Sequence, residues 1–305
     1  MDMTTIVAAA AGGAALLAAM GWSMRRRPLR GRARRARAAL ARADQLVQLM
    51  VHIQQHRGIS GAWLAGDASF AARLPDKQAA VSRLFAALLE GMAQEDGEPY
   101  PCFVSNDVRL LRHQWRELVA ELGGGPPEGN FQSHCRIVAK LLDWLAALGE
   151  ARVEQPLAGV IPAAATRNLY QRLPVLAECL GQSRALGSAV AVKRHCPPVS
   201  RVRLAFLAAR CETLLGQALA AAGGRNAVVC GEARQAVAAY VAAIRERLLV
   251  TREIGISAAD YFALATRAMD AVFAWLEAQK RDAAASLEQL GAGARPSGAA
   301  CGAGS

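Results

Sequence analysis

The chain has 305 residues, of which 53% are hydrophobic and 5% aromatic, and its formal net charge is +11. Its length is enough for a substantial core, and its abundant alanine, leucine and arginine predict an all-α protein. Nine arginines lie between Arg25 and Arg42, so most of the positive charge belongs to one segment. A nucleic-acid-binding domain would spread basic and aromatic residues over a folded face, so we expect no nucleic-acid partner.

The N-terminal segment contains an uncharged run of 19 residues, Thr4 to Trp22. A helix needs about this length to cross a bilayer core of about 30 Å. A cleaved signal peptide is the alternative, but its positive charge would precede the apolar run, whereas here the arginines follow it. The positive-inside rule places these arginines in the cytoplasm. We therefore expect a single-pass inner-membrane anchor at 1–24, an Arg-rich juxtamembrane segment at 25–42, and a soluble domain facing the cytoplasm.

The seven cysteines are scattered along the chain and form no CxxC or CxxCH motif. An odd and unpatterned number of cysteines argues against a disulfide framework. We expect free, buried cysteines in a reducing compartment, which agrees with a cytoplasmic domain.

Helical periodicity, capping residues and Pro/Gly breaks predict eight helices after the anchor. Their approximate ranges are 33–65, 75–95, 105–122, 131–148, 164–194, 199–222, 226–250 and 257–290. Pro174 could kink the fifth of these helices. Residues 154–163 separate the first four helices from the last four. The pattern predicts two tandem four-helix bundles, at about 43–150 and 162–290, followed by a disordered tail at 291–305.

A short internal repeat lies in the first helix of each predicted bundle. Gln55 to Gly61 reads QHRGISG, and Gln182 to Ser188, 127 residues later, reads QSRALGS. In each copy an arginine, Arg57 or Arg184, occupies a position on the apolar stripe of its helix. Neither arginine has a carboxylate three or four residues away on its own helix.

A buried guanidinium needs an opposite charge, and an external anion would supply one. The planar fork of N–H donors suits a small planar or bent oxyanion. Small residues beside the arginines would let helices approach closely, and their hydroxyl groups could add donors. We therefore expect an anion site formed by Arg57, Arg184, Ser60, Gly61, Gly187 and Ser188. The alternative is that each arginine reaches the surface or pairs with a carboxylate on a neighbouring helix.

Three segments of the chain resemble the nitrate- and nitrite-sensing (NIT) domain family. The Gln-x-x-Arg-Gly-Ile-Ser-Gly-x-Trp-Leu pattern at 54–64 resembles its opening signature, and 182–188 resembles its mid-domain motif. Residues 257–270 (SAADYFALATRAMD) resemble its closing segment, in which an aromatic pair precedes a threonine and a basic residue. The resemblance spans about residues 40 to 280.

The resemblance implies an all-helical pair of four-helix bundles that binds nitrate or nitrite through arginines between helices. By position it implies ligand contacts for Arg57 and Arg184, and for Arg267 beside Thr266. Arg267 lies off the apolar stripe with Asp270 at i+3, so a surface ion pair is the alternative. Members of this family are often dimeric and carry an output module, so the resemblance implies a homodimer and a downstream signalling partner that the sequence does not identify.

No sequence motif indicates catalysis, a metal site or a cofactor. The five histidines show no HExxH spacing, and Gly123-Gly124-Gly125 precedes prolines in place of the Lys-Ser/Thr of a phosphate loop. We expect a sensor that is not an enzyme. The competing hypothesis is a membrane-tethered helical scaffold that binds protein and is indifferent to nitrate.

Overall fold

The computed structural model describes residues 3–125, 127–249 and 253–292, with side chains between residues 29 and 290. Helices and short turns make up the described residues, and no strand occurs among them. The prediction of an all-α protein is therefore confirmed. The helices are α1 (Met3–Leu64), η1 (Ala68–Arg73), α2 (Leu74–Glu90), α3 (Ala93–Asp96), α4 (Ser105–Ala120), α5 (Pro127–Leu148), η2 (Gly149–Glu154), α6 (Ala163–Arg167), η3 (Asn168–Arg172), α7 (Leu173–Lys193), α8 (Pro198–Ala222), α9 (Ala227–Ala243), η4 (Ile244–Leu248) and α10 (Ala258–Ala292).

Local sequence signals explain several helix ends. Pro198 begins α8, where a missing N–H costs nothing, and Gly223 ends it with φ +56°, in the left-handed region that favours glycine. Ser257 caps α10, because its hydroxyl oxygen accepts the Asp260 N–H at 3.1 Å. The second predicted helix, 75–95, is wrong near its end, since Gly91 separates α2 from α3.

Three helical segments have π geometry, which the sequence analysis did not predict: η2, η3 and η4. Segment η3 ends two residues before Pro174, the second residue of α7. Proline has no N–H, and its ring displaces the carbonyl four residues earlier, so a wider turn here accommodates the ring. The predicted helix at 164–194 is therefore α6, η3 and α7 in succession.

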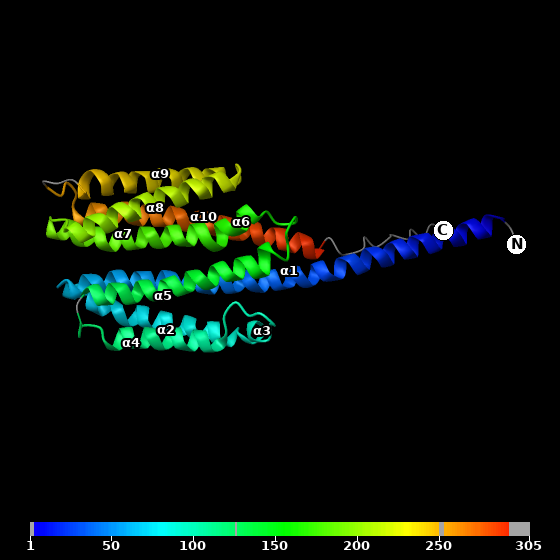
Figure 1. The fold of residues 1–305 in the computed structure, drawn as a ribbon, viewed down its shortest axis with the longest axis horizontal. Coiled ribbons are helices and arrows are strands. Elements are labelled where there is room, and N and C mark those ends of the chain that lie inside the picture. The colour runs from blue at the N-terminus through cyan, green and yellow to red at the C-terminus, as the bar shows by residue number, and fades with distance from the viewer. Residues whose placement is uncertain (1–2, 126, 250–252, 293–305) are drawn as a thin grey trace, which may run out of the picture.

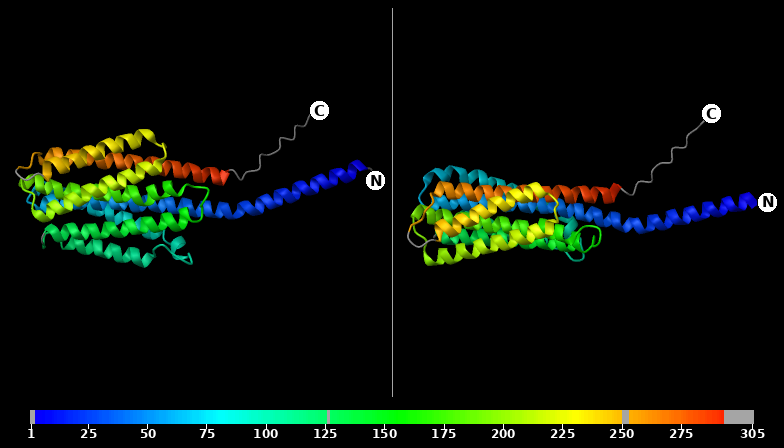
Figure 2. Two further views of the ribbon diagram at one scale, coloured as in Figure 1. Left: turned by 45° about the horizontal axis from the view of Figure 1, so that its top comes forward. Right: turned by 90° about the horizontal axis from the view of Figure 1, so that it is seen from above.

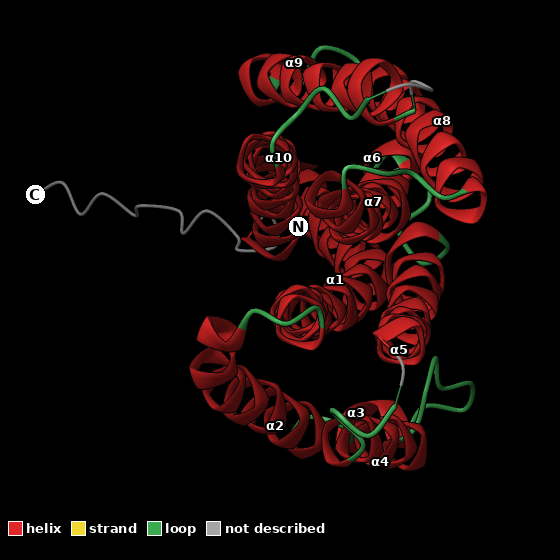
Figure 3. Ribbon diagram, turned by 90° about the vertical axis from the view of Figure 1, so that its left-hand side faces the viewer, coloured by secondary structure: helices red, strands yellow, loops and turns green. Residues whose placement is uncertain are grey.

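The helices form two neighbouring groups that share one core. Helices α1, α2, α4 and α5 lie together, and α7, α8, α9 and α10 lie beside them, as the end-on view in Figure 3 shows. Helix α1 contacts α7 and α10, so it joins the groups at the centre (Figure 1). The buried apolar side chains of both groups form one continuous cluster. The packing therefore places the two arginine motifs on adjacent helices.

The N-terminal part of α1 projects beyond the other helices, and the C-terminal part of α10 lies at the same end of the molecule (Figure 2). Near this end, Arg37 Nη2 donates to the carbonyl of Leu287 at 2.7 Å. Further along α1, Asp44 Oδ1 accepts from Lys280 Nζ at 2.6 Å. Helices α1 and α10 are thus joined by polar contacts where α1 leaves the helical groups.

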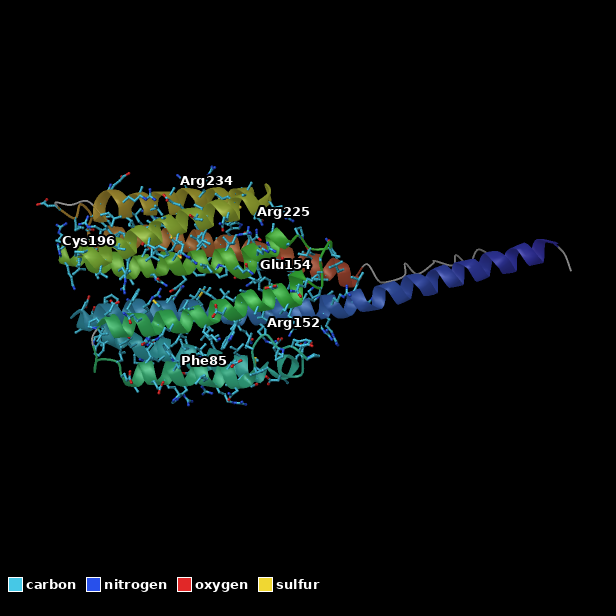
Figure 4. All side chains as sticks on the ribbon, in the orientation of Figure 1. Phe85, Arg152, Glu154, Cys196, Arg225 and Arg234 are labelled. Carbon is cyan, nitrogen blue, oxygen red and sulfur yellow. The ribbon has the colours of Figure 1, made fainter. Side chains whose placement is uncertain are left out.

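A buried charged cluster stabilises the same end of the molecule. Glu95 accepts from Arg42 Nη1 at 3.2 Å, from Arg152 Nη2 at 2.6 Å and from the Cys102 N–H at 2.7 Å. Burial alone would raise the pKa of Glu95, but Arg152 and the Cys102 N–H outweigh it and lower this pKa. Figure 4 shows Arg152 near the point where α1 projects, whereas Cys196 lies at the opposite end.

The six cysteines with described side chains are free, and four of them are buried, as the sequence predicts: Cys179, Cys196, Cys211 and Cys230.

By length and hydropathy, two described stretches could cross a membrane: Pro198–Ala222 and Ala227–Leu248. Both contribute buried core residues, such as Cys211 and Tyr240, and helices in a packed core commonly have the same length and hydropathy. The expected anchor at Thr4 to Trp22 lies within α1, in the part whose side chains are not described.

Candidate anion-binding site

Arg57 lies on α1 and faces α7, where Glu178 binds it through two hydrogen bonds. Arg57 Nη1 donates to Glu178 Oε1 at 2.6 Å, and Arg57 Nη2 donates to Glu178 Oε2 at 3.2 Å. Both residues are buried, with exposed fractions of 2% and 4%. The expectation that Arg57 has no acidic partner is therefore wrong. Its own helix offers none, but the facing helix does.

Glu178 is surrounded by further donors. Gln54 Nε2 donates to Glu178 Oε2 at 2.7 Å, and Gln182 Nε2 donates to Glu178 Oε1 at 2.7 Å. Burial by itself would lower the pKa of Arg57, but the charges and hydrogen bonds of Glu178 and Cys135 together outweigh burial and raise it. The ion pair therefore keeps both of its charges inside the fold.

The remaining contacts of Arg57 come from α5 and α7. Its Nη1 lies 3.2 Å from Cys135 Sγ, and its guanidinium carbon lies 5.4 Å from the centre of the Phe131 ring. A Cβ atom on Gly181 would lie 2.9 Å from Arg57 Nη2, so glycine at this position gives the guanidinium its room against α7. The Arg57 Nε atom is buried and has no hydrogen-bond partner among the described residues.

Arg184, on α7, is half-buried and has a different environment. Its Nη1 donates weakly to Thr266 Oγ1 at 3.4 Å, and its guanidinium carbon lies 4.9 Å from the centre of the Phe262 ring. Within the described part of the chain, no carboxylate oxygen lies within 4.0 Å of its nitrogens. Arg184 is thus a cation held by a hydroxyl group and an aromatic face.

The pKa of Arg184 lies below its ordinary value. Burial lowers the pKa of Arg184, and the positive charge of Arg57 lowers it further, whereas Tyr240 and Asp270 act in the opposite direction. Asp270 is exposed on α10. The arginines of the two repeat copies therefore lie on two helices that contact each other, α1 and α7, and Glu178 of α7 pairs with Arg57.

Two buried tyrosines hold α7 in place beside Arg184. Tyr261 Oη donates to the Ser183 carbonyl at 2.8 Å, and the hydroxyl groups of Tyr240 and Tyr261 lie 2.6 Å apart. Tyr240 Oη also lies 3.0 Å from Ser183 Oγ. These contacts join α7, α9 and α10 at the residue that precedes Arg184.

The other predicted site residues have separate placements. Ser60 Oγ donates to the Arg57 carbonyl at 3.3 Å and accepts from Asn130 Nδ2 at 3.0 Å. Gly61 is half-buried with open space beside it, whereas Gly187 packs against Tyr261. The Ser188 hydroxyl group is buried without a hydrogen-bond partner among the described residues. Arg267 is exposed and forms no ion pair with a described residue.

Sequence reasoning missed Glu178, Gln54, Gln182, Phe262 and Thr266 as neighbours of the arginines. A signal for the last two was present, because they lie four residues apart and so share one face of α10. A signal for Glu178 was also present, since it is an acidic residue in the otherwise apolar run Leu173–Leu180. Among the described residues, no group of three or more His, Cys, Asp or Glu side chains could hold a metal ion.

Comparison with known proteins places these motifs in context. The model of one protein family, described as nitrate and nitrite sensing, matches residues 48–285. No curated protein matches the chain. Among solved structures, the one titled "Structure of the NasR transcription antiterminator" superposes with a TM-score of 0.63 and 19% sequence identity. The match covers 90% of this chain and 75% of that chain, and at this identity it shows a shared fold.

Proposed function

We propose, from the premise that the chain belongs to the nitrate- and nitrite-sensing family, that it binds nitrate or nitrite between α1 and α7. The family match over residues 48–285 confirms the resemblance read from the sequence. The observation that carries the proposal is Arg184, a half-buried guanidinium with no carboxylate within 4.0 Å among the described residues, which contacts Thr266 and Phe262. A planar oxyanion could accept two of its N–H groups at once.

The charges near Arg184 support an anion with a single negative charge. Arg57 and Glu178 neutralise each other, which leaves the charge of Arg184 to be balanced. Unused donors support the same proposal, because Arg57 Nε and Ser188 Oγ are buried without partners among the described residues. Buried donors normally find an acceptor, and a small oxyanion would be one.

A route for the signal is part of the proposal. Phe262 and Thr266, which contact Arg184, lie on α10, and the same helix contacts α1 at Arg37 and Asp44. Anion binding that favours one position of α10 would therefore shift it against α1. In this proposal the two helical groups act as two four-helix bundles. Residues 1–24 anchor the chain in the inner membrane. The sensing domain at about 43–290 faces the cytoplasm and forms a homodimer.

The test is a thermal unfolding series on the full-length chain with nitrate, nitrite, chloride and sulfate. Nitrate or nitrite should stabilise the protein preferentially, by about 2.7 kcal/mol at 100 times the dissociation constant. Arg184→Ala should lose this stabilisation, whereas Arg267→Ala, which removes an exposed arginine from α10, should keep it. Equal effects of all four anions on the unaltered protein would contradict the proposal.

The competing hypothesis of an interaction scaffold has one observation in its favour. Val199, Val202 and Phe206 lie along α8 at spacings of three and four residues, and they are 65%, 71% and 61% exposed. Such an apolar stripe is typical of a surface that contacts another protein. A scaffold predicts no stabilisation by any of the four anions, so the same unfolding series separates the two hypotheses.

A further inference from the structure

Three segments surround α1 where it leaves the helical groups (Figure 2): the loop 97–104, the loop 155–162 and the C-terminal part of α10. An arginine of α1 contacts each of these segments. The contacts join Arg35 Nε to Glu98 Oε1 at 3.5 Å, Arg32 Nη1 to the Pro156 carbonyl at 3.4 Å, and Arg37 Nη2 to the Leu287 carbonyl at 2.7 Å. Because the three arginines lie within two turns of α1, the segments form a collar at one level along this helix.

The two loops of the collar each carry an exposed apolar side chain. Tyr100 is 87% exposed, and Val160 is 44% exposed. The backbone at Tyr100 is fixed, because Arg152 Nη2 donates to its carbonyl at 2.8 Å. Pro99 and Pro101 on either side restrict the chain further. A rigid loop therefore holds an aromatic ring outside the fold.

The positive charge of α1 is concentrated beside the collar. Residues 25–42 contain nine arginines and no acidic residue. Arg34 is exposed and forms no ion pair with a described residue. The Arg35 side chain remains 59% exposed although it pairs with Glu98. A basic segment of this kind is attracted to anionic lipid headgroups, and the attraction falls off within a Debye length.

The proposed anchor brings the collar close to a bilayer. Because α1 is one helix from Met3 to Leu64, Arg32 lies about 15 Å along its axis from Trp22, the last residue of the apolar run. The headgroup region extends about 5–8 Å beyond the hydrocarbon core. With Trp22 at the edge of that core, the collar lies about 7–10 Å beyond the headgroups, which is about one Debye length at physiological ionic strength. A tilt of about 20°, which is common for transmembrane helices, brings one side of the collar closer.

We propose that the collar is a lipid-binding surface, which lies against the anionic headgroups of the bilayer with the Tyr100 ring among them. This inference rests on the proposed function, because it requires the anchor at residues 1–24. The side chains suit this partner. Guanidinium groups bind phosphate through two donors at once. A tyrosine has an apolar ring and a polar hydroxyl group, and this residue is enriched where a membrane meets water.

The experiment places a solvent-sensitive fluorescent label on the full-length protein. Tyr100→Cys carries a nitrobenzoxadiazole label and is reconstituted into phosphatidylcholine vesicles with or without phosphatidylglycerol. In the vesicles with phosphatidylglycerol the emission should shift to shorter wavelength. Salt at about 1 M should abolish the shift, because the Debye length is then about 3 Å. Adding Arg34→Glu to the labelled variant should reduce the shift, because it reverses a charge beside the collar.

Val199→Cys, labelled in the same way, is the matched control. Val199 is 65% exposed and lies three residues after Cys196, which Figure 4 shows at the opposite end of the molecule. Its label should emit at the same wavelength in both kinds of vesicle. The unaltered protein, treated with the same reagent, gives the contribution of the native cysteines.

The outcomes separate this inference from the proposed anchor. If the unaltered protein floats with neither kind of vesicle in a density gradient, the anchor and this inference both fail. If it floats, but the label at Tyr100 emits at the same wavelength in both kinds of vesicle, only the inference fails. Should labelled Tyr100→Cys not fold, labelled Val160→Cys decides in the same way, because Val160 lies in the other loop of the collar.

Discussion

At Gly187 a polar ring approaches the backbone of α7 so closely that no side chain fits. A Cβ atom there would lie 2.2 Å from the Tyr261 hydroxyl oxygen. The same hydroxyl group donates to the Ser183 carbonyl, one turn earlier. Gly187 was predicted to lie beside the ligand. The structure assigns it a contact with a tyrosine that holds α7 next to Arg184.

We expect Gly187→Ala to reduce the free energy of unfolding by about 1–3 kcal/mol, because the methyl group overpacks a buried site. Urea denaturation of the full-length protein measures this change. Gly216→Ala on α8 is the matched control, since a Cβ atom there meets nothing within 4 Å. That substitution should raise the free energy of unfolding by about 0.4–1 kcal/mol, because alanine restricts the unfolded chain. Equal effects of the two substitutions would contradict the packing seen at Gly187.

The sequence predicted the surroundings of the two arginines on their own helices, but not the contacts from facing helices. The apolar stripes of both helices placed Arg57 and Arg184 inside the fold, and neither finds an acidic partner on its own helix. The spacing of residues along one helix says nothing about the facing helix, so Glu178 as the partner of Arg57 could not be predicted in that way. For Arg184, the absence of a nearby carboxylate holds across the described residues.

At the scale of helices, a chain of hydrogen bonds between buried side chains joins α1, α2 and α5. His134 Nδ1 donates to the Asn130 carbonyl at 2.7 Å, so its Nε2 accepts from His56 Nδ1 at 2.8 Å. His56 Nε2 then accepts from Gln78 Nε2 at 3.3 Å. Burial lowers the pKa of His134 to about 3 and the pKa of His56 to about 4. Both imidazoles are therefore neutral in the folded protein.

This chain of hydrogen bonds makes stability depend on pH. Because both folded pKa values lie below the ordinary value of about 6.5, the unfolded state binds more protons as the pH falls. The contribution of the two histidines to the free energy of unfolding should be complete above about pH 6.5. It should decrease as the pH falls towards 4. Carboxylates contribute in the same direction only below about pH 4.5, so the range from pH 6.5 to 5 reports the histidines.

The measurement is the midpoint of thermal unfolding between pH 7 and 5. In His134→Gln the midpoint should decrease less steeply as the pH falls. In His113→Gln the decrease should be unchanged, because His113 is exposed on α4. A decrease of the same steepness in both variants would show that the buried histidines are not its cause.

The helix boundaries were the part of the fold most accessible from the sequence. Pro198, Gly223 and Ser257 act through backbone geometry and local hydrogen bonds, so their effects can be read within a few residues. The π-helical segments and the break at Gly91 were missed. A wider turn depends on how the helix packs against its neighbours, as at Asn168, whose Nδ2 donates to the Ala218 carbonyl of α8 at 2.9 Å.

At the scale of the whole molecule, the arginines fall into two groups along the chain. The arginines at 25–42 lie on α1 before the candidate site, and the last of them, Arg42, is buried beside Glu95, whereas Arg57 lies further along α1 and Arg184 lies on α7. The sequence predicted two bundles in succession. The structure joins its two helical groups through one continuous core, because α1 packs against α7 and α10 as well as against α2 and α5.

The proposed anchor makes a prediction for the whole chain. Deleting residues 1–24 should move the protein from the membrane fraction to the soluble fraction after cell lysis, because the apolar run at Thr4 to Trp22 is removed. Immunoblotting of the two fractions measures the change. A full-length protein found in the soluble fraction would contradict the anchor.

The proposed function depends on an anion bound beside Arg184. Isothermal titration of the full-length protein with nitrate and with nitrite tests this claim most directly. We predict saturable binding of at least one of the two anions with one site per chain, lost in Arg184→Ala and retained in Arg267→Ala. An unchanged isotherm in Arg184→Ala, or no binding of either anion to the unaltered protein, would contradict it.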